Sequence, residues 1–170
     1  MRATLTLSLT VGGLLVTPAY AATLEVNVEI PKIDVAEYHR PYVAVWVEGA
    51  DAQVAQNLAV WYQNKGTAEG HGTKWLPDLR QWWRKSGRSA QLPIDGVTGP
   101  TRPVGTHALS FSQAQLRDLK PGQYTLVVEA AREVGGRELL KVPFQWGGGA
   151  QQGKAQGSSE LGAVSLAVRP

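Results

Sequence analysis

The sequence contains no cysteine, one methionine and two phenylalanines among its 170 residues. Without thiols, disulfides cannot stabilise the fold, and thiolate metal sites, iron–sulfur clusters, haem attachment through cysteine and cysteine nucleophiles are excluded. The sequence also lacks a GxSxG or HExxH motif, Walker or Rossmann glycine patterns and paired carboxylates at a fixed spacing. It therefore gives no indication of hydrolase, transferase or nucleotide-binding activity, and we do not expect an enzyme.

The sequence also lacks a strong excess of either positive or negative charge. The formal net charge is +3, and basic and acidic residues are interspersed along the chain. A nucleic-acid-binding protein would concentrate Lys and Arg on one face, so nucleic acid is not an expected partner. No apolar run reaches the roughly 20 residues that span a bilayer, and stable membrane insertion is not expected either.

The first 21 residues have the pattern of a secretory signal peptide. Arg2 provides a positive start, an apolar stretch covers Leu5 to Val16, and small residues precede Ala22. We predict cleavage after Ala21 and a soluble, periplasmic mature protein. Residues 22–170 are enough for a single domain that buries roughly 70% of its unfolded surface.

Most of the mature chain has the pattern of short β-strands. Leu24, Val26, Val28 and Ile30 alternate with polar residues, which predicts a half-buried strand over Thr23–Ile30. Residues 42–48 are apolar on both faces, as in a central strand. Further strands are predicted over 56–63, 106–111, 123–133, 138–146 and 160–168, and Gly135-Gly136 indicates a hairpin between two of them.

This strand pattern predicts an all-β fold, an immunoglobulin-like antiparallel β-sandwich. A jelly roll or a small barrel is the competing arrangement. Residues 147–159 (GGGAQQGKAQGSS) have the composition of a flexible Gly-rich linker within the domain.

One segment changes from a two-residue to a helical period. Leu76, Leu79 and Trp83 lie at i, i+3 and i+7, Pro77 stands near the start and Gly87 just after the end. We predict one short helix here, within a long crossover between strands.

The tryptophans of this segment allow two interpretations. Trp75, Trp82 and Trp83 could cap one end of the sandwich as core residues. Alternatively they form an aromatic surface for a ligand or partner, with Arg80 and Arg84 supplying cationic contacts. Adjacent residues cannot both point inward from one helix, so Trp82 or Trp83 should be partly exposed.

The three histidines lie in three separate segments, at His39, His71 and His107. Imidazoles from different segments can meet in a fold and bind a metal, but exposed or structural roles are the simpler interpretation, and no metal site is predicted. His71 is the most interesting of the three because it lies in the Gly-flanked loop before the Trp-rich helix, where it could join the ligand or partner surface.

The heptamer Asp95-Gly96-Val97-Thr98-Gly99-Pro100-Thr101 can be explained as two consecutive turns. Its context suggests more. The chain resembles an exported bacterial family, domain-of-unknown-function family 2271, in the stretches VEIPKIDVAEYHRPYVAVWVE (28–48), LAVWY (58–62), GTKWLPDLRQWWRKSG (72–87), DGVTGPTRP (95–103) and KPGQYTLVVEAAREVGGRELLKVPF (120–144). This resemblance implies an association with PepSY-type membrane proteins and with flavin transferases, and hence electron transfer outside the cytoplasm in a membrane redox or iron-uptake system.

The flavin transferases attach FMN covalently to Ser or Thr within the pattern Asp-x-x-Ser/Thr-Gly-Ala-Ser/Thr. By this resemblance Asp95, Thr98 and Gly99 match the pattern, and Thr101 would be the FMN acceptor. Pro100 stands where the pattern has Ala, and its ring fixes φ and restricts Gly99. The Trp-rich helix would lie near the attached flavin.

Two functional hypotheses follow. In the first, the protein is a periplasmic accessory of a membrane redox or iron-uptake system and carries FMN. In the second, it is a cofactor-free binding or structural module that docks another envelope protein through the Trp/Arg surface.

Overall fold

The computed structural model describes residues 22–66 and 71–170. The signal peptide predicted over residues 1–21 lies outside this range. The strands are β1 (Thr23–Ile30), β2 (Tyr42–Glu48), β3 (Val54–Trp61), β4 (Thr98–Gly99), β5 (Gly105–Ser112), β6 (Gly122–Ala131), β7 (Arg137–Trp146), β8 (Gln151–Gln156) and β9 (Ala163–Arg169). Between β3 and β4 lie the 3₁₀ helix η1 (Gly72–Asp78), the helix α1 (Arg80–Lys85) and the 3₁₀ helix η2 (Gly87–Ser89).

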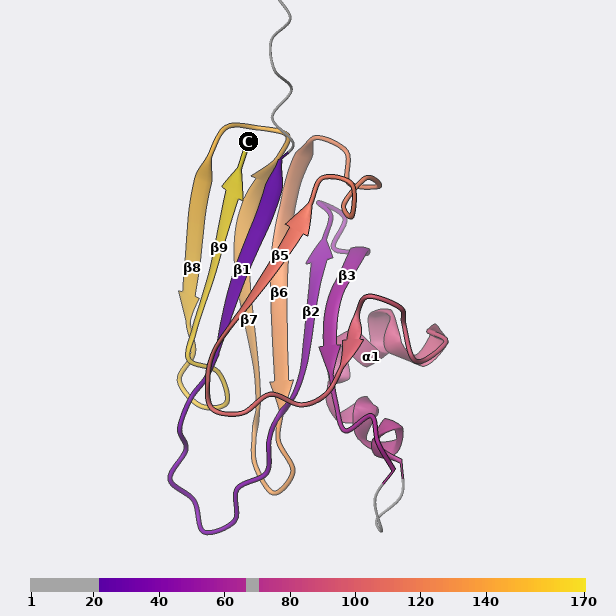
Figure 1. The fold of residues 1–170 in the computed structure, drawn as a ribbon, viewed down its shortest axis with the longest axis vertical. Coiled ribbons are helices and arrows are strands. Elements are labelled where there is room, and N and C mark those ends of the chain that lie inside the picture. Colours follow the sequence, from indigo (N-terminus) through magenta and orange to yellow (C-terminus); the bar gives the residue numbers. More distant parts are fainter. Residues whose placement is uncertain (1–21, 67–70) are drawn as a thin grey trace, which may run out of the picture.

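The strands form two sheets that pack face to face (Figure 1). One sheet has the order β5-β1-β9-β8 and the other β4-β3-β2-β6-β7. Their strand pairs are antiparallel except for the short pair of β3 with β4. The sandwich predicted from the sequence is therefore confirmed, and the sheets do not close into a barrel.

Alternating apolar residues fill the space between the sheets. The inward face of β1 consists of Leu24, Val26, Val28 and Ile30, which are buried as their period of two predicts. They pack against inward residues of the other sheet, including Val45 and Val128. The predicted bounds of β1 and β2 agree with the structure, and β2 lies centrally between β3 and β6.

The linker prediction for residues 147–159 needs correction. Gln151–Gln156 forms β8, which pairs with β9 over its whole length. The small residues have a packing role, since a Cβ on Gly153 would lie 2.6 Å from Cγ1 of Val142 on β7. This strand faces β7 with Gly and Ala rather than with large apolar side chains, and so it lacks the usual sequence signal of a strand.

The crossover from β3 to β5 passes over the outer face of the five-stranded sheet before it reaches the other sheet. Leu76, Leu79 and Trp82 of this segment are buried against Trp46 and Val127 and form a second apolar cluster there. The central strands β2 and β6 are thus covered on both faces, which explains why β2 is apolar on both sides.

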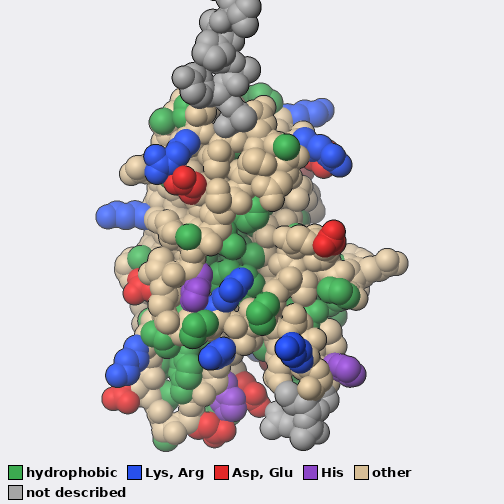
Figure 2. Space-filling model, in the orientation of Figure 1, with side chains coloured by type: hydrophobic (Ala, Val, Ile, Leu, Met, Phe, Trp, Pro, Cys, Tyr) green, Lys and Arg blue, Asp and Glu red, His purple; other side chains and the backbone are tan. Residues whose placement is uncertain are grey.

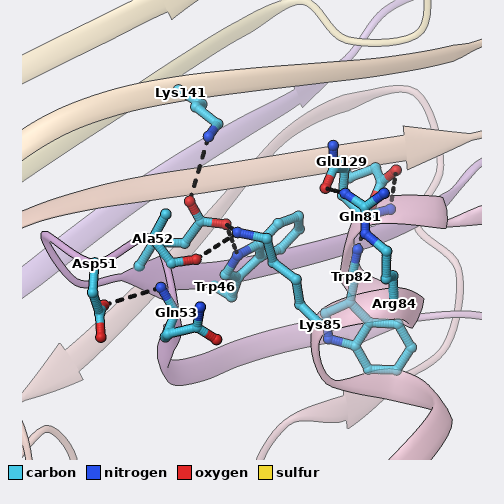
Figure 3. Close-up of polar contacts among 11 residues, drawn as sticks. Trp46, Asp51, Ala52, Gln53, Gln81, Trp82, Arg84, Lys85, Glu129 and Lys141 are labelled. Carbon is cyan, nitrogen blue, oxygen red and sulfur yellow. Dashed lines mark hydrogen bonds and ion pairs between the residues drawn. The ribbon is translucent and has the colours of Figure 1, made fainter.

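The predicted short helix is present but divided into η1, α1 and η2. A buried carboxylate on the sheet fixes the start of α1: Glu129 of β6 accepts hydrogen bonds from the backbone N–H groups of Gln81 (3.0 Å) and Trp82 (2.8 Å) (Figure 3). Free N–H groups at a helix start need such acceptors, and no side chain of the preceding residue provides one.

A second carboxylate holds the other end of α1. Glu48 of β2 accepts from the Trp46 indole (3.0 Å) and from Lys85 Nζ (2.7 Å), and Lys141 Nζ lies 3.4 Å away (Figure 3). Burial acts to raise the pKa of Glu48, but the hydrogen bonds from Lys85 and Trp46 and the charge of Lys141 outweigh it and lower that pKa. The helical segment is therefore fastened at both ends by carboxylates of the sheet.

Candidate functional site

A cavity of about 370 Å³ lies at one end of the sandwich. Its volume falls in the range of small-molecule sites. Residues from several separate segments line it: His39, Arg40 and Tyr42 around the start of β2, Gln63 after β3, Trp75 and Asp78 of η1, Thr101, and Ala131 to Val134 at the β6–β7 turn. The hairpin tip, the 31–41 connection and the crossover meet at this end, as Figure 1 shows.

Trp75 provides the aromatic wall of the cavity. Its side chain is 44% exposed, and Lys74 Nζ lies 4.7 Å from the centre of its ring. Thr101 lies on the same cavity although it is 26 positions further along the chain. The structure therefore brings together one residue of the predicted aromatic surface and the predicted acceptor hydroxyl.

Tyr42 and His39 form a polar wall. The Tyr42 hydroxyl donates to the carbonyl of Gly72 (3.1 Å), and burial raises the pKa of this hydroxyl, so it stays protonated at neutral pH. His39 lies between two carboxylates, with Nε2 2.8 Å from Glu37 and Nδ1 3.5 Å from Glu133. These contacts connect the 31–41 segment to the β6–β7 turn.

Arg132 lies at the base of the cavity with its side chain only 6% exposed. Its Nε donates to Glu160 (2.8 Å) and its Nη2 lies 3.2 Å from the same carboxylate. Its Nη1 is buried and has no hydrogen-bond partner among the described residues. A buried N–H donor without an acceptor is uncommon, and it leaves one hydrogen bond of Arg132 unsatisfied at this end of the protein.

The heptamer 95–101 does not gather its four matching residues at one place. Thr98 and Gly99 form β4 beside β3, and the Thr98 hydroxyl accepts from the Ile94 N–H (2.8 Å). Asp95 lines a different cavity, next to Gln56 and Asn57, while Thr101 lines the cavity with Trp75. The heptamer therefore runs along the edge of the sheet, with Thr101 at its cavity end and Asp95 at the other.

The comparison with protein families matches residues 23–163 to domain-of-unknown-function family 2271, described as a predicted periplasmic protein. The chain belongs to this family. Neither the curated proteins nor the solved structures contain a match to it. Within residues 22–66 and 71–170, no helix is long and apolar enough to cross a membrane.

For this member of family 2271, the predicted Trp/Arg surface requires a correction at Trp82. This side chain is fully buried, its indole donates to Asn57 (3.0 Å), and it belongs to the core rather than to a ligand or partner surface. Trp83 is partly buried against the same cluster, which agrees with the expectation that one of the adjacent pair reaches the surface. Arg80, Arg84 and His71 are exposed, and Arg84 contacts Gln81.

The three histidines lie at three different places in the fold. His39 borders the cavity, His71 precedes η1, and His107 packs edge-on against Trp61 on the other side of the crossover. Among the residues that the structure describes, no cluster of three His, Asp or Glu side chains could hold a metal ion.

Sequence reasoning missed the exposed apolar side chain of Val134 at the cavity. The large apolar side chains that are exposed in the described part of the chain are Val35, Tyr38, Trp75, Val104 and Val134. Two of them, Trp75 and Val134, line the cavity itself. Val134 is 76% exposed and has φ +52°, a left-handed conformation that is strained for a β-branched residue. An exposed, strained valine at a hairpin tip suggests a role in binding.

Proposed function

We propose that this protein is a periplasmic accessory of a membrane redox or iron-uptake system that carries FMN on Thr101. One observation carries the proposal: the hydroxyl-bearing Thr101 and the exposed indole of Trp75 share one cavity with the guanidinium of Arg40 and the imidazole of His39. A tethered flavin needs such an attachment point, an aromatic surface and cations near its phosphate.

The residues at this end fit an attached FMN in three respects. Thr101 is only partly buried, and none of the hydrogen bonds found among the described residues engages its hydroxyl. Trp75 offers ring surface at the cavity. The exposed Arg40 adds positive charge, and Nη1 of Arg132 adds a hydrogen-bond donor without a partner among the described residues. Asp95 lies too far along the sheet edge to share the cavity, so its place in the motif would concern recognition by the transferase.

Attachment would form a phosphoester bond between the Thr101 oxygen and the FMN phosphorus, with AMP leaving a flavin adenine dinucleotide donor and the hydroxyl proton passing to solvent. When bound, the flavin supplies one- and two-electron transfer. The chain's own residues would hold it: Trp75 stacks against a planar ring, and Arg40 pairs with the phosphate. His39, placed between Glu37 and Glu133, keeps the adjoining loop against the hairpin.

Coexpression with a flavin transferase tests this proposal by intact-mass measurement. We expect the wild-type protein to gain the mass of one FMN moiety and Thr101→Val to gain none. Thr106→Val, an exposed threonine outside the motif, is the matched control and should still be modified. Pro100→Ala restores the small residue of the pattern and should raise the modified fraction. Unmodified wild type, with a control acceptor modified in the same cells, would refute the proposal.

The second candidate is a cofactor-free module that docks another envelope protein. The exposed side chains of Trp75 and the strained Val134 at the cavity favour this role more than the Arg80–Arg84 surface does, because Trp82 is buried. A purified PepSY-type membrane protein in detergent would be the test partner. If flavin-free wild type binds this partner and Val134→Ser does not, docking through the cavity end is favoured. If binding depends instead on Trp83 and Arg84, docking through the Trp/Arg surface is favoured.

A further inference from the structure

The outer edge of β5 has unpaired backbone groups. β5 pairs only with β1 in its sheet and forms the edge of that sheet. The N–H of Ser112 donates to Gln115 Oε1 (2.9 Å), and its carbonyl accepts from Gln115 (3.0 Å) and Leu116 (3.1 Å), so both groups point away from β1. In an antiparallel strand every second residue points its N–H and C=O to the same side. Thr106, Ala108 and Ser110 therefore point outward too, and no backbone partner for them occurs among the described residues.

This edge lacks the usual protection against pairing with another chain. Edge strands are commonly blocked by charged residues or proline. β8, at the other edge of the same sheet, contains Lys154, and the edge strand β7 contains Lys141 and Pro143. β5 (GTHALSFS) contains no Lys, Arg, Asp, Glu or Pro. The sequence of β5 therefore leaves its edge open.

A groove runs beside this edge. A cavity of about 260 Å³ lies between β5 and the β3–β4 pair and is lined by Leu109, Ser110 and Phe111 on one side and by Leu58, Trp61 and Thr98 on the other. Figure 2 shows hydrophobic side chains in a column down the middle of this face of the molecule. We call this space the edge groove.

Arg102 adds a cationic donor to the edge groove. Its guanidinium lies 5.3 Å from the centre of the Trp61 ring, and Trp61 also contacts His107 edge-on. Arg102 Nε is buried and has no hydrogen-bond partner within the described residues. A buried donor of this kind is satisfied by a carbonyl or carboxylate oxygen.

We propose that the edge groove binds an extended segment of another polypeptide, which adds as a fifth strand beside β5. The outward N–H and C=O groups of Thr106, Ala108 and Ser110 would pair with its backbone, as in other cases of strand addition. Alternate apolar side chains of the segment would enter the groove above Trp61 and Phe111, and an acidic group or carbonyl would meet Arg102. This site is separate from the cavity of Thr101 and does not depend on FMN.

The β1 sequence supplies a defined probe, the acetylated and amidated peptide TLEVNVEI, which pairs with β5 from the other side and is apolar at alternate positions. Titration into ¹⁵N-labelled protein should shift the amide resonances of Thr106, Ala108 and Ser110 and the Arg102 Nε resonance, with little change at β8. A peptide in which both valines are replaced by proline should have no effect.

Ala108→Pro tests the edge itself. The Ala108 N–H faces outward, so proline removes a donor for the added strand without removing a bond to β1. We expect peptide binding at least about 10-fold weaker than wild type. Ala108→Val keeps the N–H and is the matched control, which should bind normally; Arg102→Leu should weaken binding without preventing folding.

Three outcomes would overturn the proposal. The first is unchanged β5 amide resonances at millimolar peptide, and the second is equal binding by folded Ala108→Pro and Ala108→Val. The third is a wild-type dimer in sedimentation equilibrium that Ala108→Pro converts to monomer, because a second copy of the chain would then occupy the edge.

Discussion

Glu129 and Trp82 are joined by a 2.8 Å hydrogen bond from the Trp82 backbone N–H to a fully buried carboxylate. The residues are 47 positions apart, and the bond fixes the start of α1 to β6. The same carboxylate accepts from Gln81 and from Arg137 Nη1 (2.9 Å), so its charge is compensated although it is buried. The sheet, rather than the helix, supplies the helix cap.

Replacing Glu129 should therefore weaken the attachment of α1 to β6. In Glu129→Gln the side chain keeps its size but loses its charge and one acceptor oxygen. We therefore expect the free energy of unfolding to be about 2–3 kcal/mol lower than that of wild type. Urea denaturation followed by circular dichroism measures this change. Glu133→Gln, at an exposed carboxylate beyond the end of the same strand, is the control and should lie within about 0.5 kcal/mol of wild type. Equal effects would show that the cap is unimportant.

Gly87 offers a second test of the helical segment. A Cβ at this position would overlap the Trp82 ring, at 2.7 Å from Cε3 and closer still to Cζ3. We expect Gly87→Ala to destabilise the protein by about 1–3 kcal/mol, as overpacking does. Gly149→Ala is the control, since nothing lies within 4 Å of its Cβ position. Thermal unfolding of both variants decides the matter, and an unaffected Gly87→Ala would mean that Trp82 can move aside.

The strands could be predicted where side-chain periodicity reflects burial directly. β1 alternates because one face packs on the core, and β2 is apolar throughout because the sheet is covered on both sides. β8 could not be predicted, since its small residues Gly153 and Ala155 are required by the close approach of β7 rather than by an apolar face. The helix was located correctly, but its division into three pieces depends on tertiary contacts such as Glu129 with Trp82.

The candidate site could be predicted only in part. Motif and composition single out Thr101 and Trp75, but no sequence pattern groups them with Arg132, His39 or Tyr42, which come from distant segments. The role of Trp82 was open because periodicity places it on the edge of the apolar stripe, and only the bond to Asn57 and the contact with Gly87 identify its core position.

Acid should weaken the turn that follows β8. The Glu138 carboxylate accepts backbone hydrogen bonds from residues 158–161, including Leu161 at 2.8 Å. Burial acts to raise the pKa of Glu138, but the bonds from Ser158, Leu161 and Ser159 outweigh it and lower that pKa from 4.5 to about 2. A lowered pKa stabilises the folded state above the unfolded value, and this stabilisation is lost as the pH falls from 4.5 towards 2.

Glu138→Gln measures this contribution. We expect wild type to exceed the variant by about 1–2 kcal/mol at pH 6, a value reduced by solvent screening at this partly exposed group, and the difference should shrink between pH 4.5 and 2. Urea titrations at four pH values in that range provide the comparison. A difference that stays constant with pH would show that the carboxylate charge is not responsible.

The left-handed conformation of Val134 should lower the free energy of unfolding, and we expect its exposed side chain to contribute to binding instead. Its φ of +52° is costly for a β-branched side chain and natural for glycine, so Val134→Gly should stabilise the protein by about 1 kcal/mol. Ala52, with φ +58° in another turn, allows a matched Ala52→Gly control with a smaller gain. If the exposed Val134 serves binding, the stabilised variant will be the one that loses affinity for partner or ligand. Thermal unfolding detects the gain, and destabilisation by Val134→Gly would contradict the strain argument.

Substitutions of Trp75 and Trp82 should have different effects, with Trp82 important for stability and Trp75 for the bound flavin. Trp82→Leu removes a fully buried ring with a hydrogen-bonded indole, and we expect a loss of about 3 kcal/mol or more. Trp75→Leu removes a ring that is 44% exposed, and stability should change by no more than about 1 kcal/mol. In protein carrying FMN on Thr101, indole stacking quenches flavin fluorescence, so Trp75→Leu should brighten the flavin while Trp83→Leu leaves it unchanged. Equal brightness in the two flavinylated variants would place the ring elsewhere than against Trp75, even with attachment at Thr101 intact.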